Sequence, residues 1–226
     1  MYRAVIFDID GTLVDSNDAH AWSWVQALAD SGRRVEFARV RPLIGKGSDK
    51  LLPELTGLSV ESPEGRAIAD RRRHILQHEF ISRIRPTPGA QQLLEWLRDD
   101  GLTLAVATSA EPSELRDLLR IAGAVRFFEA TASSAEADRS KPDPDIVHAA
   151  LERSGCRASE AIMIGDTPYD IEAAQRAGIG LIALRCGGWW SDADLSGAVA
   201  IYDDPADLVK RYDLSPFKRP LPVRSA

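Results

Sequence analysis

Cysteine is scarce in this sequence of 226 residues, which contains only Cys156 and Cys186. Neither belongs to a Cys-x-x-Cys pair or a cysteine–histidine cluster, which argues against a metal–thiolate site and a disulfide framework. Long apolar runs are also missing, since none approaches the roughly 20 residues that a membrane-spanning helix needs. A strand-like run begins directly after Met1-Tyr2-Arg3, which leaves no room for a signal peptide. We therefore expect a cytoplasmic protein in a reducing compartment.

An excess of positive charge is missing as well. The formal net charge is −6 at pH 7, so the chain has no general attraction to nucleic acids or acidic membranes. The composition, 44% hydrophobic and 27% charged with 16 glycines and 13 prolines, excludes collagen-like and disordered chains. A domain of this length buries roughly 70% of the surface that its unfolded chain exposes, so it needs no crosslink. We expect a globular monomer or homodimer with no nucleic-acid or membrane partner.

Strands and helices alternate along most of the chain. The run Ala4–Phe7 is apolar at every position, which is typical of a strand buried on both faces. Further strands are expected at 102–108, 127–132, 161–164, 180–184 and 198–202. A helix is expected at 90–99, and three later helices should begin at an N-cap followed by proline, at Asp143-Pro144, Thr167-Pro168 and Asp204-Pro205. This alternation predicts an α/β fold with a doubly wound, Rossmann-like parallel sheet.

One segment departs from this alternation. Between residues 16 and 85, apolar residues recur at intervals of three and four, which predicts an all-helical insertion after the first strand. The expected buried face of its first helix consists of Trp22, Val25, Leu28 and Ala29. We expect residues 1–15 and 86–226 to form the core, and the insertion 16–85 to form a small helical cap over it.

Polar side chains that could do chemistry follow several of these strands. The carboxyl ends of parallel strands meet at one edge of the sheet, and ligands bind in such folds at that edge. The groups expected to converge there are Asp8 and Asp10, Thr108 and Ser109, Lys141, and Asp166 and Asp170. Their convergence predicts an active site.

Asp8 and Asp10 are two carboxylates one residue apart after the first strand. A calcium loop of the DxDxDG type needs glycine at its sixth position, whereas Gly11 is the fourth residue counted from Asp8, so that type of site is excluded. Two turn-forming acids at a strand end are the simple alternative.

Asp166 and Asp170 form a second acidic loop. Thr167 and Asp170 have the spacing of a capping box, so Asp170 could serve only to cap the next helix. Asp166 precedes the cap and has no such structural role. Two acidic loops that meet at one sheet edge favour a hard divalent cation with oxygen ligands, most simply Mg²⁺.

A phosphate group at this edge would need both a metal cation and Lys141. The four carboxylates and Lys141 together carry a formal charge of −3, which Mg²⁺ would reduce to −1. Thr108 and Ser109 offer hydroxyl and backbone N–H groups for phosphoryl oxygens. A solvated lysine and a simple strand-end turn are the alternatives for these residues.

In chain order, four segments resemble the four motifs of the haloacid dehalogenase (HAD) superfamily: Asp8-Ile9-Asp10-Gly11-Thr12, Thr108-Ser109, Lys141-Pro142 and Gly165-Asp166-Thr167-Pro168-Tyr169-Asp170. The resemblance covers roughly residues 1–212, and the helical insertion resembles the C1-type cap of that family. The chain looks most similar to phosphoglycolate and sugar-phosphate phosphatases, with β-phosphoglucomutases as a neighbouring group. The resemblance implies a HAD-type phosphatase, which is a phosphoric monoester hydrolase.

The resemblance also implies a role for each core residue. Asp8 would be the nucleophile that forms an aspartyl-phosphate. Asp10 would be the acid–base that protonates the leaving alcohol and later takes a proton from water. Thr108, the Ser109 backbone and Lys141 would hold the phosphoryl group.

The same resemblance implies Mg²⁺ as the cofactor. Its ligands would be the Asp8 side chain, the Asp10 main-chain carbonyl and Asp166, with Asp170 supporting the ion or its waters. The implied substrate is a small phosphorylated metabolite of the phosphoglycolate or sugar-phosphate class.

Other activities agree less well with these residues. Dehalogenases of the superfamily lack the second carboxylate, here Asp10. A phosphonate hydrolase would use a cap lysine as a Schiff base, for which Lys46 and Lys50 are weak candidates. A β-phosphoglucomutase-like mutase is the main alternative, and it is disfavoured because residues 43–49 contain no arginine for a distal phosphate. A non-catalytic phosphate-binding or regulatory protein is the third reading, since fold alone does not determine function.

The insertion offers two candidate substrate ligands, His20 and Lys46. The alternatives are that His20 packs on the first helix of the insertion and that Lys46 is a surface lysine. The consecutive arginines Arg71–Arg73 spread around a helix, so a solvated helix is expected there. Trp189 and Trp190 either wall the substrate pocket or form a contact surface.

Overall fold

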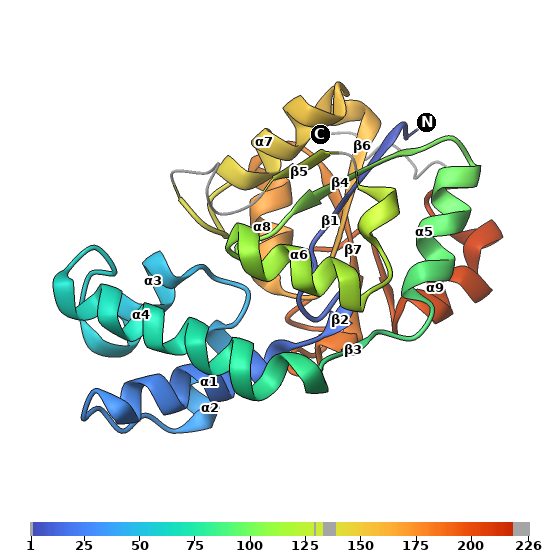
Figure 1. Ribbon diagram of the computed structural model, residues 1–226. Coiled ribbons are helices and arrows are strands. Elements are labelled where there is room, and N and C mark those ends of the chain that lie inside the picture. The colour runs from blue at the N-terminus through green and yellow to red at the C-terminus, as the bar shows by residue number, and fades with distance from the viewer. Residues whose placement is uncertain (1, 129, 133–138, 219–226) are drawn as a thin grey trace.

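A parallel β-sheet forms the centre of the protein (Figure 1). The computed structural model describes residues 2–128, 130–132 and 139–218, and within them the sheet has six strands in the order β5-β4-β1-β6-β7-β8. The strands are β1 (Ala4–Phe7), β4 (Thr103–Ala107), β5 (Ala130–Ala132), β6 (Ala161–Gly165), β7 (Gly180–Leu184) and β8 (Ala200–Tyr202). Strand β1 lies between β4 and β6, which explains why every residue of its apolar run is buried. The predicted α/β fold class is confirmed.

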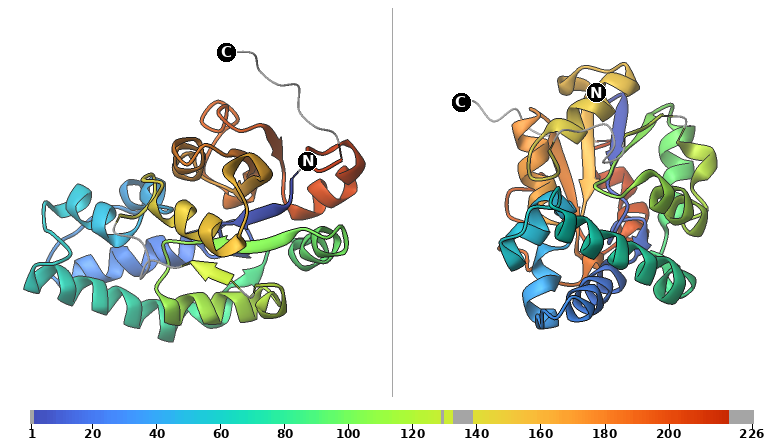
Figure 2. Two further views of the ribbon diagram at one scale, coloured as in Figure 1. Left: turned by 90° about the horizontal axis from the view of Figure 1, so that it is seen from above. Right: turned by 60° about the vertical axis from the view of Figure 1, so that its left-hand side comes forward.

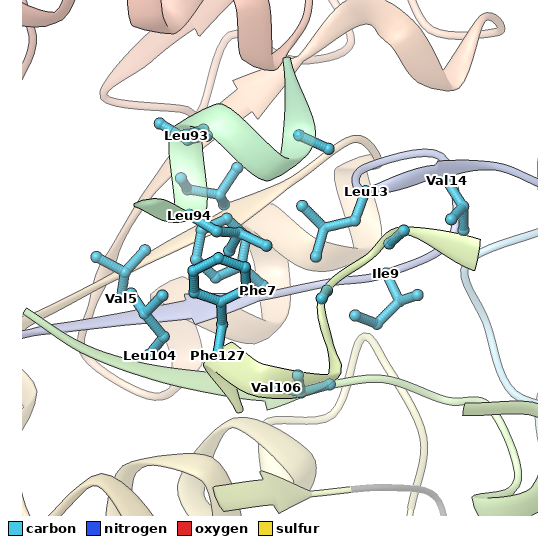
Figure 3. Close-up of a cluster of buried hydrophobic side chains, with 14 of the residues drawn as sticks. Val5, Phe7, Ile9, Leu13, Val14, Leu93, Leu94, Leu104, Val106 and Phe127 are labelled. Atoms are coloured by element: carbon cyan, nitrogen blue, oxygen red, sulfur yellow. The ribbon is translucent and has the colours of Figure 1, made fainter. Parts of the chain in front are cut away.

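Helices cover both faces of the sheet. Side chains of β1 alternate, so that Val5 and Phe7 join the core of one face while Ala4 and Ile6 join the core of the other. Apolar side chains from α5, α6 and α9 fill the first core, and those from α7 and α8, such as Ile146, Leu151 and Ile171, fill much of the second. Figure 3 shows the part of the first core around Phe7. The helices are α5 (Ala90–Asp99), α6 (Pro112–Ile121), α7 (Asp145–Ser154), α8 (Pro168–Arg176) and α9 (Pro205–Lys210). Each fully buried leucine in these cores contributes about 1.5–3 kcal/mol of burial free energy.

A separate group of helices lies beyond the carboxyl end of β1 (Figures 1 and 2). The chain enters and leaves this group through two short antiparallel strands, β2 (Val14–Asp15) and β3 (Arg85–Pro86), with Val14 opposite Pro86. Between them lie α1 (Asn17–Asp30), α2 (Phe37–Val40), α3 (Ser48–Thr56), α4 (Pro63–Ile75), a π-helical turn (Leu76–Phe80) and two 3₁₀ turns (Arg41–Leu43, Ile81–Arg83). We call residues 17–83 the helical segment. It has a hydrophobic core of its own, which includes Trp24, Leu28, Leu52 and Ile75.

The predicted buried face of α1 was wrong in part. Leu28 is buried as expected, but Trp22 is 45% exposed and Ala29 is exposed, whereas Trp24 is only 3% exposed. Trp22 stacks on Phe37 with ring centroids 4.7 Å apart. Both faces carry tryptophan at helical spacing, so hydrophobicity did not distinguish them. The packing of α1 against α4 decided which one is buried.

Several predicted boundaries also move. Residues Val125–Phe127 form a 3₁₀ turn, so the strand expected from 127 begins only at Ala130. The strands expected at 102–108 and 198–202 are shorter, at Thr103–Ala107 and Ala200–Tyr202.

The predicted helix starts are confirmed at two of three positions. The side chains of Thr167 and Asp204 accept backbone N–H groups of α8 and α9 as N-caps. At the third position Pro144, and not Asp143, is the N-cap of α7. The Asp143 carboxylate instead forms ion pairs with Lys50 and other basic side chains. Within the described residues no helix is long and apolar enough to cross a membrane.

Candidate active site

Three carboxylates lie together at the carboxyl edge of the sheet. Asp8 follows β1, Asp166 follows β6, and Asp170 lies in the first turn of α8. One carboxylate oxygen of each residue lies within 4.8 Å of the others, and all three residues are buried. We call them the carboxylate cluster. They converge because β1 and β6 are neighbouring parallel strands paired in register, so the residues that follow them lie side by side.

The ammonium group of Lys141 lies between two members of this cluster. Lys141 Nζ donates to Asp8 Oδ1 at 2.5 Å and to Asp170 Oδ1 at 2.7 Å, and its side chain is 1% exposed. Burial alone would lower the pKa of Lys141, but the charges of Asp170 and Asp8 outweigh it and raise that pKa above its ordinary value. Lys141 is therefore a buried cation, and the solvated-lysine alternative is wrong.

Asp170 has two sets of partners at once. Its Oδ2 accepts the Thr167 backbone N–H at 3.0 Å and the Thr167 hydroxyl at 2.7 Å, which completes the predicted capping box. Its Oδ1 faces Lys141. The capping alternative therefore accounts for Oδ2 but not for Oδ1. By fixing Oδ2, the cap also directs Oδ1 toward Lys141.

The cluster carries more negative charge than one lysine balances. Burial raises the pKa of Asp8 well above its ordinary value, although Lys141 opposes this shift. Burial, followed by the charge of Asp170, raises the pKa of Asp166 to about 7. Each shift measures the cost of holding a carboxylate charge away from water. The oxygen donors and the unbalanced charge match the requirements of a hard metal ion, so these residues could hold one.

Two glycines, Gly11 and Gly187, pack directly against the carboxylate of Asp166. A Cβ atom at Gly187 would lie 1.9 Å from Asp166 Oδ2, and one at Gly11 would lie 2.3 Å from it. Gly11 also has a φ of +73°, which favours glycine. The Asn17 side chain donates to Asp166 Oδ2 at 2.8 Å. These contacts fix the carboxylate, and the two glycines leave no room for side chains beside it.

The side chain of Asp10 has different partners from that of Asp8. It accepts the Ser16 hydroxyl at 2.5 Å and contacts His20 Nε2 at 2.7 Å. Burial would raise the pKa of Asp10, but the charge and hydrogen bond of His20 and the hydrogen bond of Ser16 lower it to about 2. The two carboxylates of the first loop are thus in distinct environments. His20, a predicted substrate ligand, lies against Asp10 and is buried.

Arg72 connects the helical segment to the core, and sequence reasoning missed it. Its guanidinium donates to Glu114 of α6 at 2.5 Å and contacts His20 Nδ1. Its neighbours make exposed ion pairs, Arg71 with Asp30 and Arg73 with Asp70. The expectation of a solvated helix is therefore wrong for Arg72 alone, because successive residues turn by about 100° around a helix.

A usable signal for this pair was present in the sequence. Arg72 stands at helical spacing between the buried residues Ile68 and Ile75, and Glu114 precedes the buried Leu115 on α6. A charged residue on an otherwise apolar helix face predicts a buried partner. The Ser16 and Asn17 side chains had no comparable signal.

A small pocket of about 70 Å³ opens above the carboxylate cluster. We call it the inner pocket. Its lining includes Asp8, Asp10, Lys141, Thr108 and Ser109, together with His20, Lys46 and Arg72. The Thr108 hydroxyl accepts the Ala110 N–H at 3.1 Å, whereas the buried Ser109 hydroxyl has no partner within the described residues. The predicted phosphate-binding residues Thr108, Ser109 and Lys141 thus all line one pocket. The Ser109 hydroxyl is available there for a hydrogen bond to a ligand.

Residues 5–184 match the protein-family model described as haloacid dehalogenase-like hydrolase. The chain belongs to this family. The resemblance drawn from the four motifs is therefore confirmed, and with it the expectation of a hydrolase.

Named relatives and solved structures agree with this family. A phosphoglycolate phosphatase of Rhodospirillum rubrum is 31% identical over 217 residues, covering 92% of this chain and 90% of that protein. The probable phosphatase IndB of Dickeya dadantii is 31% identical over 190 residues, covering 83% of each chain. The crystal structure of a hydrolase from Pseudomonas syringae aligns with a TM-score of 0.86 at 26% identity, covering 93% and 98% of the two chains. A β-phosphoglucomutase from Clostridium difficile shares the fold, with a TM-score of 0.82 at 19% identity and coverage of 95% and 96%.

The remaining predicted residues of this hydrolase have mixed positions. Lys46 lines the inner pocket, but its ammonium donates to Glu54 at 2.5 Å and lies 4.8 Å from the centre of the Tyr169 ring. Trp189 lies beside Arg41 and is 41% exposed, and Trp190 packs edge-on against Tyr169. Neither tryptophan is among the described residues that line the inner pocket. A contact role for Trp189 stays a prediction.

Proposed function

We propose that this hydrolase is a Mg²⁺-dependent phosphatase that cleaves small phosphorylated metabolites through an aspartyl-phosphate on Asp8. The observation that carries the proposal is the buried Lys141 ammonium between Asp8 and Asp170, beneath a pocket of about 70 Å³. This arrangement supports Asp8 as a nucleophile with a fixed positive charge beside it, at one end of a space of phosphoryl size. The relatives named as phosphatases support the same activity.

Asp8 attacks phosphorus in the first half of the proposed reaction. A bond forms between an Asp8 carboxylate oxygen and phosphorus, and the bond from phosphorus to the ester oxygen breaks. Lys141, the unpartnered Ser109 hydroxyl and Thr108 stabilise the charge on the phosphoryl oxygens. In the second half water attacks phosphorus, and the release of phosphate restores the Asp8 carboxylate.

Asp10 transfers the protons in both halves. With a pKa of about 2, Asp10 is ionised in the free enzyme, so it first takes up a proton when the negatively charged phosphate enters the pocket. It then donates that proton to the leaving alcohol oxygen and later takes one from the attacking water. Ser16 and His20 bind the Asp10 carboxylate, whereas Lys141 binds Asp8 and Asp170 and not Asp10. This separate position suits Asp10 to proton transfer rather than to attack on phosphorus. Arg72 and Glu114 hold His20 in turn, so the helical segment helps to orient Asp10.

The residues that would hold Mg²⁺ are Asp8, Asp166 and the Asp10 main-chain carbonyl, with Asp170 next to them. When bound, the ion would offset the charge of the carboxylate cluster and polarise the phosphoryl oxygens. Asn17 orients Asp166 for this purpose, and Thr167 orients Asp170.

Residues 16–85 are proposed to form a cap domain over the core of residues 1–15 and 86–226. The hydrophobic core that the helical segment has of its own supports this division. Contacts that cross between the two units hold the cap on the core. Arg72 pairs with Glu114, and the Lys50 ammonium donates to the Ser140 carbonyl at 2.7 Å. A cap held in this way would close the inner pocket around the substrate. The expected location is the cytoplasm, where such metabolites occur.

A phosphatase agrees with the pocket better than a mutase. A mutase must bind a second, distal phosphate, which needs a cation free of protein carboxylates. Within the described residues that line the inner pocket, Lys46 pairs with Glu54, Arg72 with Glu114, and Lys141 with the carboxylate cluster.

Hydrolysis of p-nitrophenyl phosphate by the purified enzyme tests the proposal. We expect no turnover in excess EDTA, recovery on adding Mg²⁺, and poor replacement by Ca²⁺, which prefers looser coordination. Asp8→Asn should show no turnover, whereas Asp213→Asn, an exposed change away from the pocket, should behave as wild type. Full activity in EDTA would refute the metal requirement, and substantial turnover by Asp8→Asn would refute the nucleophile.

A further inference from the structure

A second cavity opens beyond the inner pocket. It has a volume of about 460 Å³, and both spaces share Gly47, Ser48, Thr108, Ser109 and Glu111 in their walls. We call it the outer cavity. The inner pocket, at about 70 Å³, is far smaller. Given the proposed phosphatase function, the phosphoryl group occupies the inner pocket and the rest of the substrate extends into the outer cavity.

The outer cavity is lined by more acids than bases. Its two arginines are already occupied, because Arg66 donates to the Glu61 carbonyl oxygen at 2.7 Å and Arg73 donates to Asp70 at 3.1 Å. Glu61 and Asp70 line the same cavity, as do two further carboxylates, those of Asp49 and Glu111. Among the described residues of its lining, two arginines therefore face four carboxylates. Within the described residues that line either space, every lysine and arginine already has a protein oxygen as partner, and the one buried donor atom left unpaired among them is Nε of Arg72, in the inner pocket.

Glu111 differs from the other acids of these walls because it lacks a partner. It occupies the N-cap position of α6, yet its side chain accepts no backbone N–H of that helix. In the part of the chain that the structure describes, its carboxylate has no hydrogen bond or ion pair, whereas Glu114 one turn later is bound to Arg72. Glu111 is half-buried, two residues from Ser109, and faces both spaces.

We propose that Glu111 is a specificity-determining residue that accepts hydrogen bonds from the leaving alcohol. The preferred substrates are then phosphate monoesters whose alcohol carries hydroxyl or ammonium donors and no negative charge. A second phosphate or a carboxylate in that alcohol meets Glu111 and its acidic neighbours without a free cation, and is rejected by repulsion. A hydroxyl or ammonium group instead donates a hydrogen bond to the Glu111 carboxylate, which is half-buried and has no partner in the described residues.

A panel of phosphate esters, with the anhydride pyrophosphate added, tests this inference with purified enzyme in Mg²⁺. The donors are glycerol 3-phosphate, glucose 6-phosphate and phosphoethanolamine, and the anionic competitors are 2-phosphoglycolate and pyrophosphate. We expect kcat/KM for at least one donor substrate to exceed that for 2-phosphoglycolate by about tenfold or more, since even a water-screened like-charge contact at about 4 Å costs about 1 kcal/mol. The ranking among the three donors shows whether hydroxyl or ammonium groups are preferred.

The Glu111→Gln variant is the sharper experiment. It should lower the ratio of kcat/KM between the best donor substrate and 2-phosphoglycolate by about fivefold to tenfold, because the repulsion is lost and a weaker acceptor replaces the carboxylate. Glu152→Gln makes the same chemical change on an exposed part of α7 that lines neither space, and it should leave the ratio unchanged.

Two results would overturn the inference. One is a wild-type preference for 2-phosphoglycolate or pyrophosphate over all three donors, and the other is an equal effect of Glu111→Gln on every substrate. Both leave the proposed function standing, since the enzyme is then still a phosphatase. Loss of the proposed function has a different signature, which is the absence of Mg²⁺-dependent hydrolysis of p-nitrophenyl phosphate by the wild type.

Discussion

The floor and the roof of the inner pocket are built in different ways. We use the word floor for four residues that the core supplies, Asp8, Lys141, Asp166 and Asp170. Asp8 and Lys141 line the pocket, whereas Asp166 and Asp170 lie next to them in the carboxylate cluster and do not line it. All four side chains are almost inaccessible to water. The roof consists of side chains from the helical segment, such as Lys46 and Arg72, which keep some contact with solvent. Register between neighbouring strands positions the floor, whereas the rotation of single helices positions the roof.

This difference has an energetic consequence. Lys141 is the one cation among the four residues of the floor, so its removal leaves buried carboxylates without a positive partner, which is costly. Lys46 in the roof has its own carboxylate, Glu54, whose side chain is 49% exposed, so the same change is mild there. The predictions below contrast the two regions.

The largest effect is expected for Asp10→Asn. The variant should lose about 10²–10⁴-fold in kcat with alkyl phosphates, because the acid–base is gone while Asp8 can still attack. A good leaving group needs no proton. With p-nitrophenyl phosphate, the attack of Asp8 on phosphorus should therefore be slowed less than the later hydrolysis of the aspartyl-phosphate. Mass spectrometry of the quenched variant should then find phosphate on Asp8. Phosphate on Ser109 or a histidine would show that the nucleophile is elsewhere.

Lys141→Met should reduce both activity and stability. At pH 8 in EDTA it leaves Asp8 and Asp170 without their buried cation, so we expect a loss of about 3–5 kcal/mol in the free energy of unfolding. The matched change in the roof, Lys46→Met, should cost less than about 1 kcal/mol. Urea unfolding measures both. If both variants lost the same free energy of unfolding, the charged side chains of the floor would not depend on one another more than those of the roof.

The stability of the metal-free wild type should fall as pH rises. The pKa of Asp166 is about 7 in the folded protein against an ordinary 3.8, so between these values the folded state binds more protons than the unfolded state. Asp8 shifts in the same direction. Urea unfolding in EDTA should therefore show lower stability at pH 7.5 than at pH 5, and Mg²⁺ should reduce the difference. A rise in stability over this range in EDTA would contradict the assigned shifts.

The smallest effect is expected for Arg72→Met. The variant leaves Glu114 buried without a partner, which should cost about 1–3 kcal/mol in stability. It should also lower kcat with alkyl phosphates, because His20 loses a contact that holds it against Asp10. Arg71→Met, one residue away on the exposed side of α4, should change neither measurement. If the two variants behave alike, the roof does not orient Asp10.

The parts of the site that could be predicted from sequence belong to the floor. Asp8 and Asp166 follow apolar runs, and a parallel sheet brings the ends of such runs together whatever their separation along the chain. The capping box of Thr167 and Asp170 is likewise a local pattern with a local cause. These predictions needed the sheet topology but no knowledge of how side chains pack.

The roof could be predicted less well because it depends on packing between helices. Trp22 and Trp24 have the same hydrophobicity, and only contact with α4 decides that Trp24 is buried. The spacing of Arg72 from Ile68 and Ile75 marks it as facing inward, but only the placement of α4 opposite α6 shows that Glu114 is its partner.

The sequence by itself determined the fold class, the polar residues that follow each strand and the chemistry of the buried floor. Short-range sequence patterns and the geometry of a parallel sheet are enough to predict these three features. Only the tertiary structure decided which helix faces meet the pocket, that His20 contacts Asp10, and that Glu111 alone among the carboxylates of the two cavity walls, in the described residues, has no protein partner. These features arise from the rotation and spacing of whole helices, and many weak contacts far apart in sequence set both.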